Sequence, residues 1–195
     1  MITEFLKHTH MTHLGQSRLA VFDDLLETND LVNLHSALLQ AGYAKSGYDR
    51  TDTFDARYWS TDISLDTAES MPIFGPTSSA LESFRPENNY KLYAANINAS
   101  CYGDMLYSHL DSELGDGKVT AAWYICEKWN HEWGGETLFF DEAKDARAVV
   151  MPRPGRLAIF DSDILHAERP PNRIYFYPRY TLTLKFESFS KNLIQ

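Results

Sequence analysis

The second half of the chain, from Asn89 to Phe186, consists of short apolar or alternating runs separated by turn residues. Residues 90–102 alternate loosely, and residues 118–126 form a mostly apolar run, typical of a central strand buried on both faces. Gly134-Gly135 and Pro154-Gly155 are expected to be turns. Further strands are predicted over 105–111, 137–140, 156–160 and 180–186. This pattern predicts a mainly β fold.

Before this region, the sequence predicts a short strand and then a helix. Residues 18–22 have the composition of a strand. Thr28, Asn29 and Asp30 offer N-cap side chains for a helix that Gly42 is well placed to end. The apolar face of this helix is expected to contain Leu31, Leu34, Leu38 and Leu39. Such a helix can cover one face of the later strands.

A polar loop over residues 46–55 and a strand near residues 58–59 follow the first helix. A second helix is predicted over 76–84, between Gly75 and Pro86. Helices first, and then seven or eight short strands, fit a two-sheet antiparallel sandwich with supporting N-terminal helices.

The length and composition fit one globular domain. A chain of 195 residues is expected to form one domain over 1–195, with helical support over 18–86 and a core over about 90–187. The net charge of −9 and the pI of about 5.2 argue against a surface for nucleic acid or anionic membranes. No apolar run approaches the length of a membrane span. Neither nucleic acid nor a membrane is therefore expected as a partner, and the sequence does not predict an oligomeric state.

The two cysteines, Cys101 and Cys126, are too few for a disulfide framework. Both fall in predicted core strands, where a buried thiol is a better interpretation than a metal ligand. The first residues lack the apolar region of a signal peptide, so a reducing cytoplasm is the expected location. The histidines near the N-terminus, His8, His10 and His13, are interpreted as part of a solvated tail rather than a metal site.

Three residues have the types and spacing of a metal site. His109 and Asp111 are two residues apart, so on a strand their side chains share one face. His166, from a later strand, completes a set of two imidazoles and one carboxylate. Such a facial set leaves positions open on one side of the metal and is typical of non-haem Fe(II) sites. Each histidine alone would be interpreted as an ordinary core or surface residue.

Arg179 follows His166 by 13 residues and opens an alternating strand. A buried guanidinium there can grip a dicarboxylate through a bidentate pair, whereas alone Arg179 would be interpreted as a surface charge on an edge strand. Arg173 is a rival, but it lies only seven residues past His166 in a loop rich in Pro and Asn. Such a loop is expected to face solvent or substrate.

From about Leu92 to Phe186 the chain resembles the Fe(II)- and 2-oxoglutarate-dependent oxygenases, within them the prolyl-hydroxylase-like branch. The matching segments, in order, are A-S-C-Y-G…H-L-D, G-D-G-K-V-T-A-A-W-Y-I-C-E-K-W, W-G-G-E-T-L-F-F, P-R-P-G-R-L-A-I-F-D-S-D-I-L-H and R-Y-T-L-T-L-K-F. Their order and intervals are far more specific together than the His-x-Asp pair alone. A weaker match lies upstream, over residues 50–59.

The resemblance implies a double-stranded β-helix, a jelly-roll or cupin-like fold. It implies Fe(II), 2-oxoglutarate as cosubstrate and O₂, with ascorbate as an activator. His109, Asp111 and His166 would hold the iron, with no catalytic residue beyond these ligands. Arg179 would bind the far carboxylate of 2-oxoglutarate.

Three further residues are expected in the cosubstrate pocket. Tyr124 matches a family tyrosine that also bonds the far carboxylate. Tyr102 resembles a tyrosine near the metal-bound end, and Thr183 faces the same way along its strand as Arg179. For Tyr102, Tyr124 and Thr183 the alternative is ordinary strand packing.

The resemblance also bears on the reaction and the substrate. Related halogenases lack the carboxylate ligand, so the presence of Asp111 favours hydroxylation of an unactivated C–H bond. The expected substrate is a prolyl residue in a protein or peptide, with a free amino acid or another small metabolite as the alternative. The loop over 46–55 and the segment over 169–177 are expected near the mouth of the site.

Two other classes of protein remain open from the residues. One is a cupin-like module that binds metal without catalysis, in which Arg179 would be incidental. The other is a zinc hydrolase, because two histidines and one carboxylate also suit Zn²⁺. The chain has no His-Glu-x-x-His motif and no plausible general-base glutamate beside the ligands, which counts against the hydrolase.

Overall fold

A computed structural model describes residues 9–190 of the chain. The described strands form two antiparallel sheets, one of eight strands and one of three. In spatial order, the large sheet contains β1 (His10–Leu14), β2 (Ser17–Phe22), β9 (Arg156–Asp161), β6 (Val119–Ile125), β11 (Arg179–Ser190), β5 (Asn88–Ser100), β4 (Tyr58–Asp62) and β3 (Ala44–Gly47). The small sheet contains β10 (His166–Glu168), β7 (Thr137–Phe140) and β8 (Ala146–Val150). The fold is the predicted jelly roll, mainly β with supporting helices.

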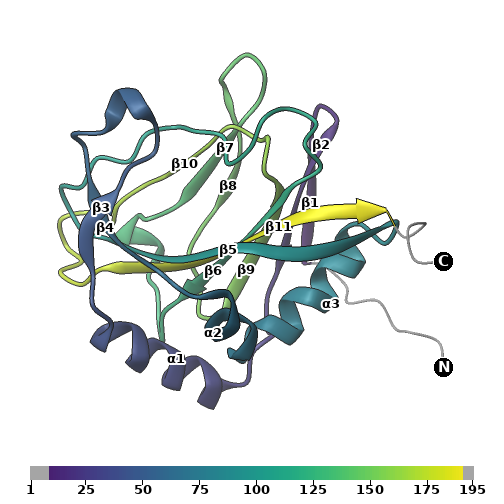
Figure 1. Cartoon of the computed structure of the whole chain (residues 1–195). Coiled ribbons are helices and arrows are strands. Elements are labelled where there is room, and N and C mark those ends of the chain that lie inside the picture. The colour runs from purple at the N-terminus through teal and green to yellow at the C-terminus, as the bar shows by residue number, and fades with distance from the viewer. Residues whose placement is uncertain (1–8, 191–195) are drawn as a thin grey trace.

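The helices lie together on one face of the large sheet, and the small sheet faces the other (Figure 1). They are α1 (Thr28–Gln40), α2 (Leu65–Ser70) and α3 (Phe74–Phe84), and the 3₁₀ turns are η1 (Thr51–Thr53) and η2 (His131–Trp133). Among residues 9–190, none of these helices has the length and apolar character needed to cross a membrane.

Alternation along β11 separates the two sides of the large sheet. Tyr180, Leu182, Leu184 and Phe186 point into the core beneath the helices. Arg179, Thr181, Thr183 and Lys185 occupy the alternate positions and face the small sheet. The same alternation continues on β5 and β6, so the sheet has an apolar face toward the helices and a polar patch on the other. That polar patch becomes the floor of the candidate site.

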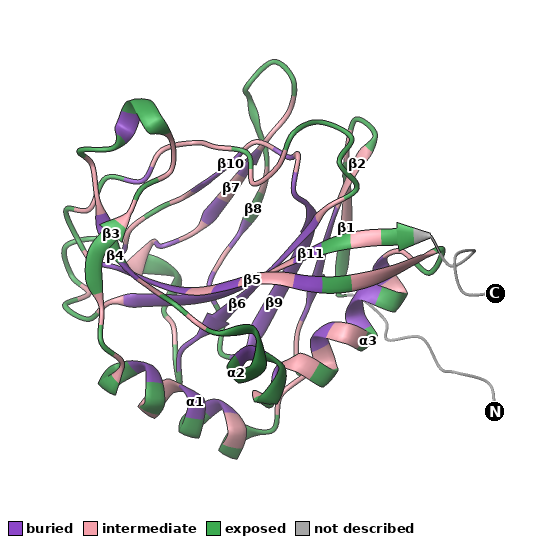
Figure 2. Ribbon diagram, viewed as in Figure 1, coloured by how far each residue is buried: buried purple, intermediate pink, exposed green. Residues whose placement is uncertain are grey.

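A second, smaller core fills part of the space between the two sheets. It is formed by buried residues of β2, β6, β7, β8 and β9, among them Phe139 and Phe160, whose rings meet edge to face at 5.0 Å. Buried positions are concentrated along the central strands and on the inner faces of α1 and α3 (Figure 2). The sheets are therefore packed together at one end, and the polar side chains meet beside this core.

Helix α1 follows the prediction except at its edges. Leu31, Leu34 and Leu38 are buried, but Leu39 is 53% exposed. One residue advances a helix by about 100°, which turns Leu39 out of the apolar stripe. The predicted N-caps belong to the first helical turn, because the N-cap is Glu27.

Other elements differ from the sequence prediction. Residues 105–111 do not form a strand, since only His109 makes a single bridge, to His166. The strands β1, β3 and β8 and the short helix α2 were not predicted, and β3 overlaps the loop predicted over 46–55. His10 and His13 lie in β1, paired with β2, rather than in a solvated tail, while His8 lies outside the described residues. Strand β1 is a polar edge strand, so its sequence lacks the regular alternation of apolar residues that predicts a strand.

Both cysteines are free thiols, but each lies just past the end of the strand that was predicted to contain it, and only Cys126 is buried as predicted. Cys126 is buried, and burial raises the pKa of its thiol to about 12. Cys101 is only partly buried, with a pKa also raised by burial. Neither has the depressed pKa of a reactive thiolate.

Replacing Phe84 by alanine should destabilise the fold strongly. Phe84 is 1% exposed and joins α3 to the core under the large sheet. Truncating a buried phenylalanine costs about 3–5 kcal/mol, because it removes apolar contacts and leaves a cavity. Urea unfolding should measure this loss, and Phe176→Ala, at a position 90% exposed, should change stability by no more than about 0.5 kcal/mol. Equal losses in the two variants would contradict the described core.

Candidate metal centre and cosubstrate pocket

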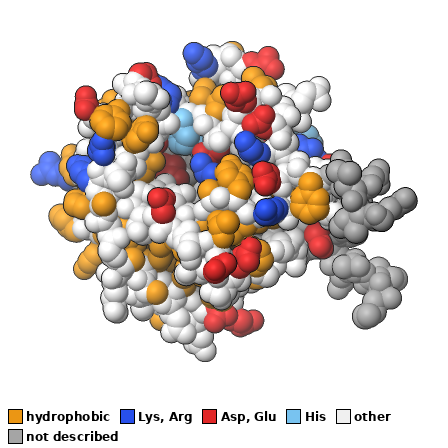
Figure 3. Space-filling model, viewed as in Figure 1, with side chains coloured by type: hydrophobic (Ala, Val, Ile, Leu, Met, Phe, Trp, Pro, Cys, Tyr) orange, Lys and Arg blue, Asp and Glu red, His pale blue; other side chains and the backbone are white. Residues whose placement is uncertain are grey.

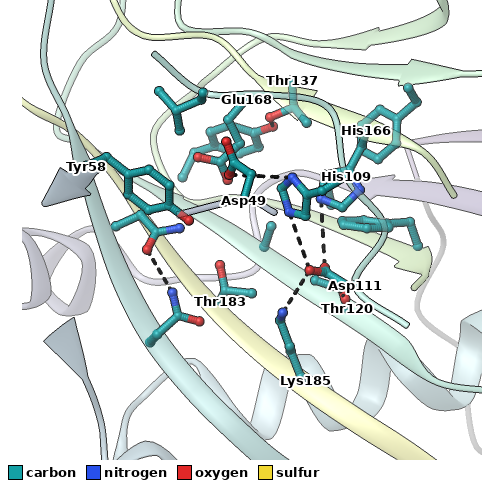
Figure 4. A pocket seen from close by; sticks show the side chains of 18 residues that line it. Asp49, Tyr58, His109, Asp111, Thr120, Thr137, His166, Glu168, Thr183 and Lys185 are labelled. Carbon is teal, nitrogen blue, oxygen red and sulfur yellow. Dashed lines mark hydrogen bonds and ion pairs between the residues drawn. The ribbon is translucent and has the colours of Figure 1, made fainter. Parts of the chain in front are cut away.

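A pocket opens between the two sheets, over the polar patch of the large sheet. The face toward the viewer in Figure 3 is hollowed, and a histidine and charged side chains of both signs are visible at the hollow. The lining side chains include His109, Asp111 and His166 from the predicted metal site, and Tyr124 and Thr183 from the predicted cosubstrate pocket. Figure 4 shows the metal-site residues and Thr183 converging from loops and strands far apart in the sequence.

The three predicted metal ligands meet closely. The Nε2 atom of His109 lies 3.6 Å from Oδ1 of Asp111, and the Nε2 atom of His166 lies 3.8 Å from Oδ2 of the same carboxylate. One ligand atom from each residue falls within 4.8 Å of the others. These three residues would hold a metal ion, each through one ligand atom.

Backbone pairing brings these residues together without a strand at residues 105–111. His109 and His166 exchange backbone hydrogen bonds of 2.9 and 3.0 Å. The backbone N–H of Asp111 donates to the carbonyl of Ser162 at 2.9 Å. The loop before β6 is thus fixed against the segment between β9 and β10, which holds the three side chains in place.

Both imidazoles are oriented to offer an unprotonated Nε2 atom. Nδ1 of His109 lies 3.1 Å from the carbonyl oxygen of Tyr107, and Nδ1 of His166 lies 2.9 Å from that of Ile164. A ring that donates from Nδ1 keeps the lone pair on Nε2, the atom that faces Asp111 in both residues. The residues therefore fit a divalent first-row metal, with the carboxylate as the anionic ligand.

Asp111 is held from both sides. The hydroxyl of Thr120 donates to Oδ2, and the ammonium of Lys185 donates to Oδ1, each at 2.7 Å. Burial alone would raise the pKa of Asp111, but its interactions with His109, His166 and Lys185 hold that pKa well below its ordinary value. The carboxylate is therefore ionised and ready to bind a cation.

The two histidines differ in their pKa directions. Burial lowers the pKa of His166 below its ordinary value. Burial has the same effect on His109, but the neighbouring carboxylates of Asp111 and Asp49 outweigh it and leave the pKa of His109 raised. A proton on His109 therefore competes with a metal as the pH falls.

Arg179 lies at the deep end of the polar patch. Its side chain is 1% exposed and its guanidinium stacks over the ring of Tyr124, 5.0 Å from the centroid. Its Nη2 atom donates to Thr137 at 3.0 Å, and its Nη1 atom donates to Thr181 at 2.6 Å and to Glu168 at 2.8 Å. Among the described residues, its Nε atom has no hydrogen-bond partner. A buried donor without a partner suits an incoming acceptor.

The other predicted cosubstrate residues divide into two groups. Tyr124 and Thr183 line the pocket with the metal ligands, and the hydroxyl of Tyr124 donates to Thr137 at 2.7 Å. Tyr102 does not line it, because β5 ends at Ser100 and the turn that follows leaves Tyr102 62% exposed. Arg173, the rival to Arg179, is exposed.

Several pocket residues were missed by the sequence prediction. Asp49 accepts a hydrogen bond from the backbone of Tyr107 and lies 3.5 Å from Nδ1 of His109, and burial raises its pKa. Lys185 and Glu168 also line the pocket. Lys185 was detectable, because it shares the strand face of Arg179. In the sequence, Asp49 is marked only by lying in the loop predicted at the mouth, and Glu168 only by lying two residues after His166.

The segment over 169–177 contributes to a different hollow. Its residues 174–177 line a cavity of about 440 Å³ beside α1, together with Trp133 and Tyr180. Among the described residues, the metal pocket is bordered instead by the loop that carries Asp49. Of the two segments expected at the mouth, only the first lines the site.

In a comparison with protein families, residues 97–187 match the family model described as the 2OG-Fe(II) oxygenase superfamily. This range contains all the predicted metal ligands and Arg179. Comparison with curated proteins finds no match.

Solved structures share the fold. A prolyl-4-hydroxylase from Pseudomonas putida superposes with a TM-score of 0.65 at 19% identity, covering 87% of this chain and 92% of that one. A prolyl hydroxylase from Trichoplax adhaerens, in complex with a hypoxia inducible factor peptide fragment, gives 0.64 at 19% identity and covers 87% and 83%. HygX from Streptomyces hygroscopicus, with nickel and 2-oxoglutarate bound, gives 0.62 at 14% identity and covers 87% and 82%.

Proposed function

We propose that the chain is a dioxygenase of the 2OG-Fe(II) oxygenase superfamily and that it hydroxylates an unactivated C–H bond. Membership implies Fe(II), 2-oxoglutarate and O₂ as reactants. The observation that carries the proposal is the meeting of two Nε2 atoms and one ionised carboxylate in a pocket that extends toward Arg179. We also propose ascorbate as an activator and the cytoplasm as the location.

His109, Asp111 and His166 would hold the iron on one side and leave its other positions open. When bound, Fe(II) and 2-oxoglutarate supply the oxidising chemistry, in which O₂ is consumed and succinate and CO₂ are released. Thr120 and Lys185 fix the orientation of the Asp111 carboxylate through its two oxygens. The protein thereby keeps its only proposed anionic ligand from rotating away.

Arg179, Tyr124 and Thr183 would hold the cosubstrate. A buried guanidinium binds a carboxylate through charge-assisted hydrogen bonds that are stronger in a sheltered site. The ring of Tyr124 supports the guanidinium from one side. On the metal side, Phe139 and Phe160 pack against the ring of His166 at 5.9 and 4.8 Å between centroids and shelter it from water.

For the substrate, we propose a prolyl residue in a protein or peptide. Two structures with this fold are prolyl hydroxylases, and one of these holds a peptide fragment.

A pocket floor of amide and hydroxyl groups favours the alternative, a free amino acid or another small metabolite. In that floor, Oδ1 of Asn98 accepts hydrogen bonds from Ser60 at 3.0 Å and Asn96 at 2.8 Å, and Lys185 stands at 25% exposure nearby.

The purified protein, supplied with Fe(II), ascorbate, O₂ and 2-oxoglutarate, should release succinate slowly without added substrate. The proposed iron and cosubstrate residues bind everything that this uncoupled turnover needs. Zn²⁺ in place of iron should stop it, because Zn²⁺ has no redox chemistry. Proline-containing peptides should accelerate the release if the substrate is prolyl, and free amino acids should do so if it is a small molecule.

This measurement also separates the two remaining classes. A cupin-like module that only binds metal, or a zinc hydrolase, forms no succinate under any of these conditions. Absence of iron-dependent succinate would therefore reject the proposed oxygenase and leave those classes standing.

A further inference from the structure

The arginine proposed to hold the cosubstrate already holds a carboxylate of the protein. Nη1 of Arg179 donates to Oε2 of Glu168 at 2.8 Å, and the two side chains are 1% and 13% exposed. Glu168 is the last residue of β10, two positions after His166. An ion pair this well sheltered is little screened by solvent.

Glu168 also stands between the pocket and the arginine. Glu168, Tyr124 and Thr137 line the pocket, whereas Arg179 does not reach its lining. A ligand that enters from the metal site therefore meets the carboxylate of Glu168 before it meets the guanidinium.

Three of the five N–H donors of Arg179 have a partner among the described residues. A guanidinium has five N–H donors and binds a carboxylate best through two parallel ones. Glu168 and Thr181 take Nη1, and Thr137 accepts from Nη2. The unpartnered Nε atom is buried. A second carboxylate cannot form a bidentate pair through Nη1 and Nη2 while Glu168 remains in place.

We propose that Glu168 determines cosubstrate affinity by competing with the far carboxylate of 2-oxoglutarate for Arg179. This inference rests on the proposed function. Binding of 2-oxoglutarate through Nη1 and Nη2 then exchanges one carboxylate for another at the guanidinium, and the internal ion pair opens. A 2-oxo acid without a far carboxylate has no reason to displace Glu168. Glu168 thus sets how strongly the pocket prefers a dicarboxylate.

The test is the affinity of 2-oxoglutarate for the Mn²⁺-loaded protein, measured by isothermal titration calorimetry without turnover. Glu168→Gln keeps the shape of the side chain but removes its charge. We expect this variant to bind 2-oxoglutarate about tenfold more tightly, or better, since no charge-assisted hydrogen bond has to be broken first. Glu187→Gln, at an exposed position of β11, is the matched control and should leave the affinity unchanged.

Two comparisons make the result specific to the ion pair. In an Arg179→Ala background, Glu168→Gln should give no gain, because the competed cation is absent. 2-Oxobutanoate, which lacks the far carboxylate, should bind the wild-type protein and Glu168→Gln equally. Should Glu168→Gln unfold, Glu168→Ala provides the same loss of charge, and urea unfolding midpoints will show which variant is intact.

The outcomes are distinct. Unchanged or weaker binding of 2-oxoglutarate by a folded Glu168 variant, with normal binding by the wild type, overturns the inference and leaves the proposed function intact. A gain that persists in the Arg179→Ala background also overturns it. No binding of 2-oxoglutarate by the wild type or by any variant overturns both the inference and the proposed function.

Discussion

Replacing Asp111 by alanine should abolish iron-dependent succinate formation. Asp111 is the only carboxylate among the three proposed ligands, and its oxygens lie 3.6 and 3.8 Å from the two imidazole Nε2 atoms. Its removal takes the negative charge from the site and leaves the ammonium of Lys185 without its partner. The measurements are succinate release and the iron retained after gel filtration, and both should fall to background.

Asp116→Ala is the matched control for this variant. Asp116 lies in the same loop region, is exposed, and pairs only with Lys118 in the described contacts of its carboxylate. It should keep wild-type iron and wild-type turnover. Wild-type turnover in Asp111→Ala with Fe(II) would show that the assignment of the three ligands is wrong.

Arg179→Ala should raise the 2-oxoglutarate concentration required for half-maximal turnover by about 10- to 150-fold. This range corresponds to the loss of a charge-assisted hydrogen bond worth about 1.5–3 kcal/mol. The dependence of succinate release on 2-oxoglutarate concentration measures it. The variant also leaves Glu168 buried without its cation, so unfolding by urea must be compared in parallel.

Arg173→Ala tests the choice between the two arginines. Arg173 is exposed, and Arg179 lies on the strand face that forms the pocket floor. The 2-oxoglutarate requirement should therefore stay nearly unchanged in Arg173→Ala. The reverse pattern, a steep rise in Arg173→Ala and none in Arg179→Ala, would show that Arg173 and not Arg179 binds the far carboxylate of the cosubstrate.

The sequence predicted those parts of the fold that a strict period encodes. Alternation in residues 179–186 indicated β11 and placed Arg179 and Thr183 on one face, which the structure bears out. The apolar run of β6 correctly indicated a strand buried on both sides. Edge strand β1 and helix α2 are short and polar, and no period marks them.

Site residues could be predicted where their type and spacing in the sequence indicate the chemistry. They could not be predicted where only tertiary contacts bring them to the site. His109, Asp111 and His166 were expected together and do converge, although the strand predicted to carry the first two is a loop held by backbone bonds to Ser162 and His166. Tyr102 is exposed because β5 ends at Ser100 and the chain turns directly after it, with Gly103 at a φ of +93°.

The carboxylates of Asp49 and Glu168 illustrate what a linear motif omits. Each is sheltered in the pocket and meets a predicted site residue only through the fold, Asp49 beside His109 and Glu168 on Arg179. Acidic residues in loops and at strand ends are ordinarily solvated, so no feature of the sequence places these two inside.

The most direct test of the central claim is an anaerobic titration of the protein with Fe(II) and then with 2-oxoglutarate. If the three ligands hold iron and the pocket holds the cosubstrate against it, a weak visible charge-transfer band should grow with 2-oxoglutarate and saturate at one equivalent per protein. The band should be absent with Zn²⁺ and absent in Asp111→Ala. A wild-type protein that binds Fe(II) but develops no band at any 2-oxoglutarate concentration would contradict the assignment of this site to oxygenase chemistry.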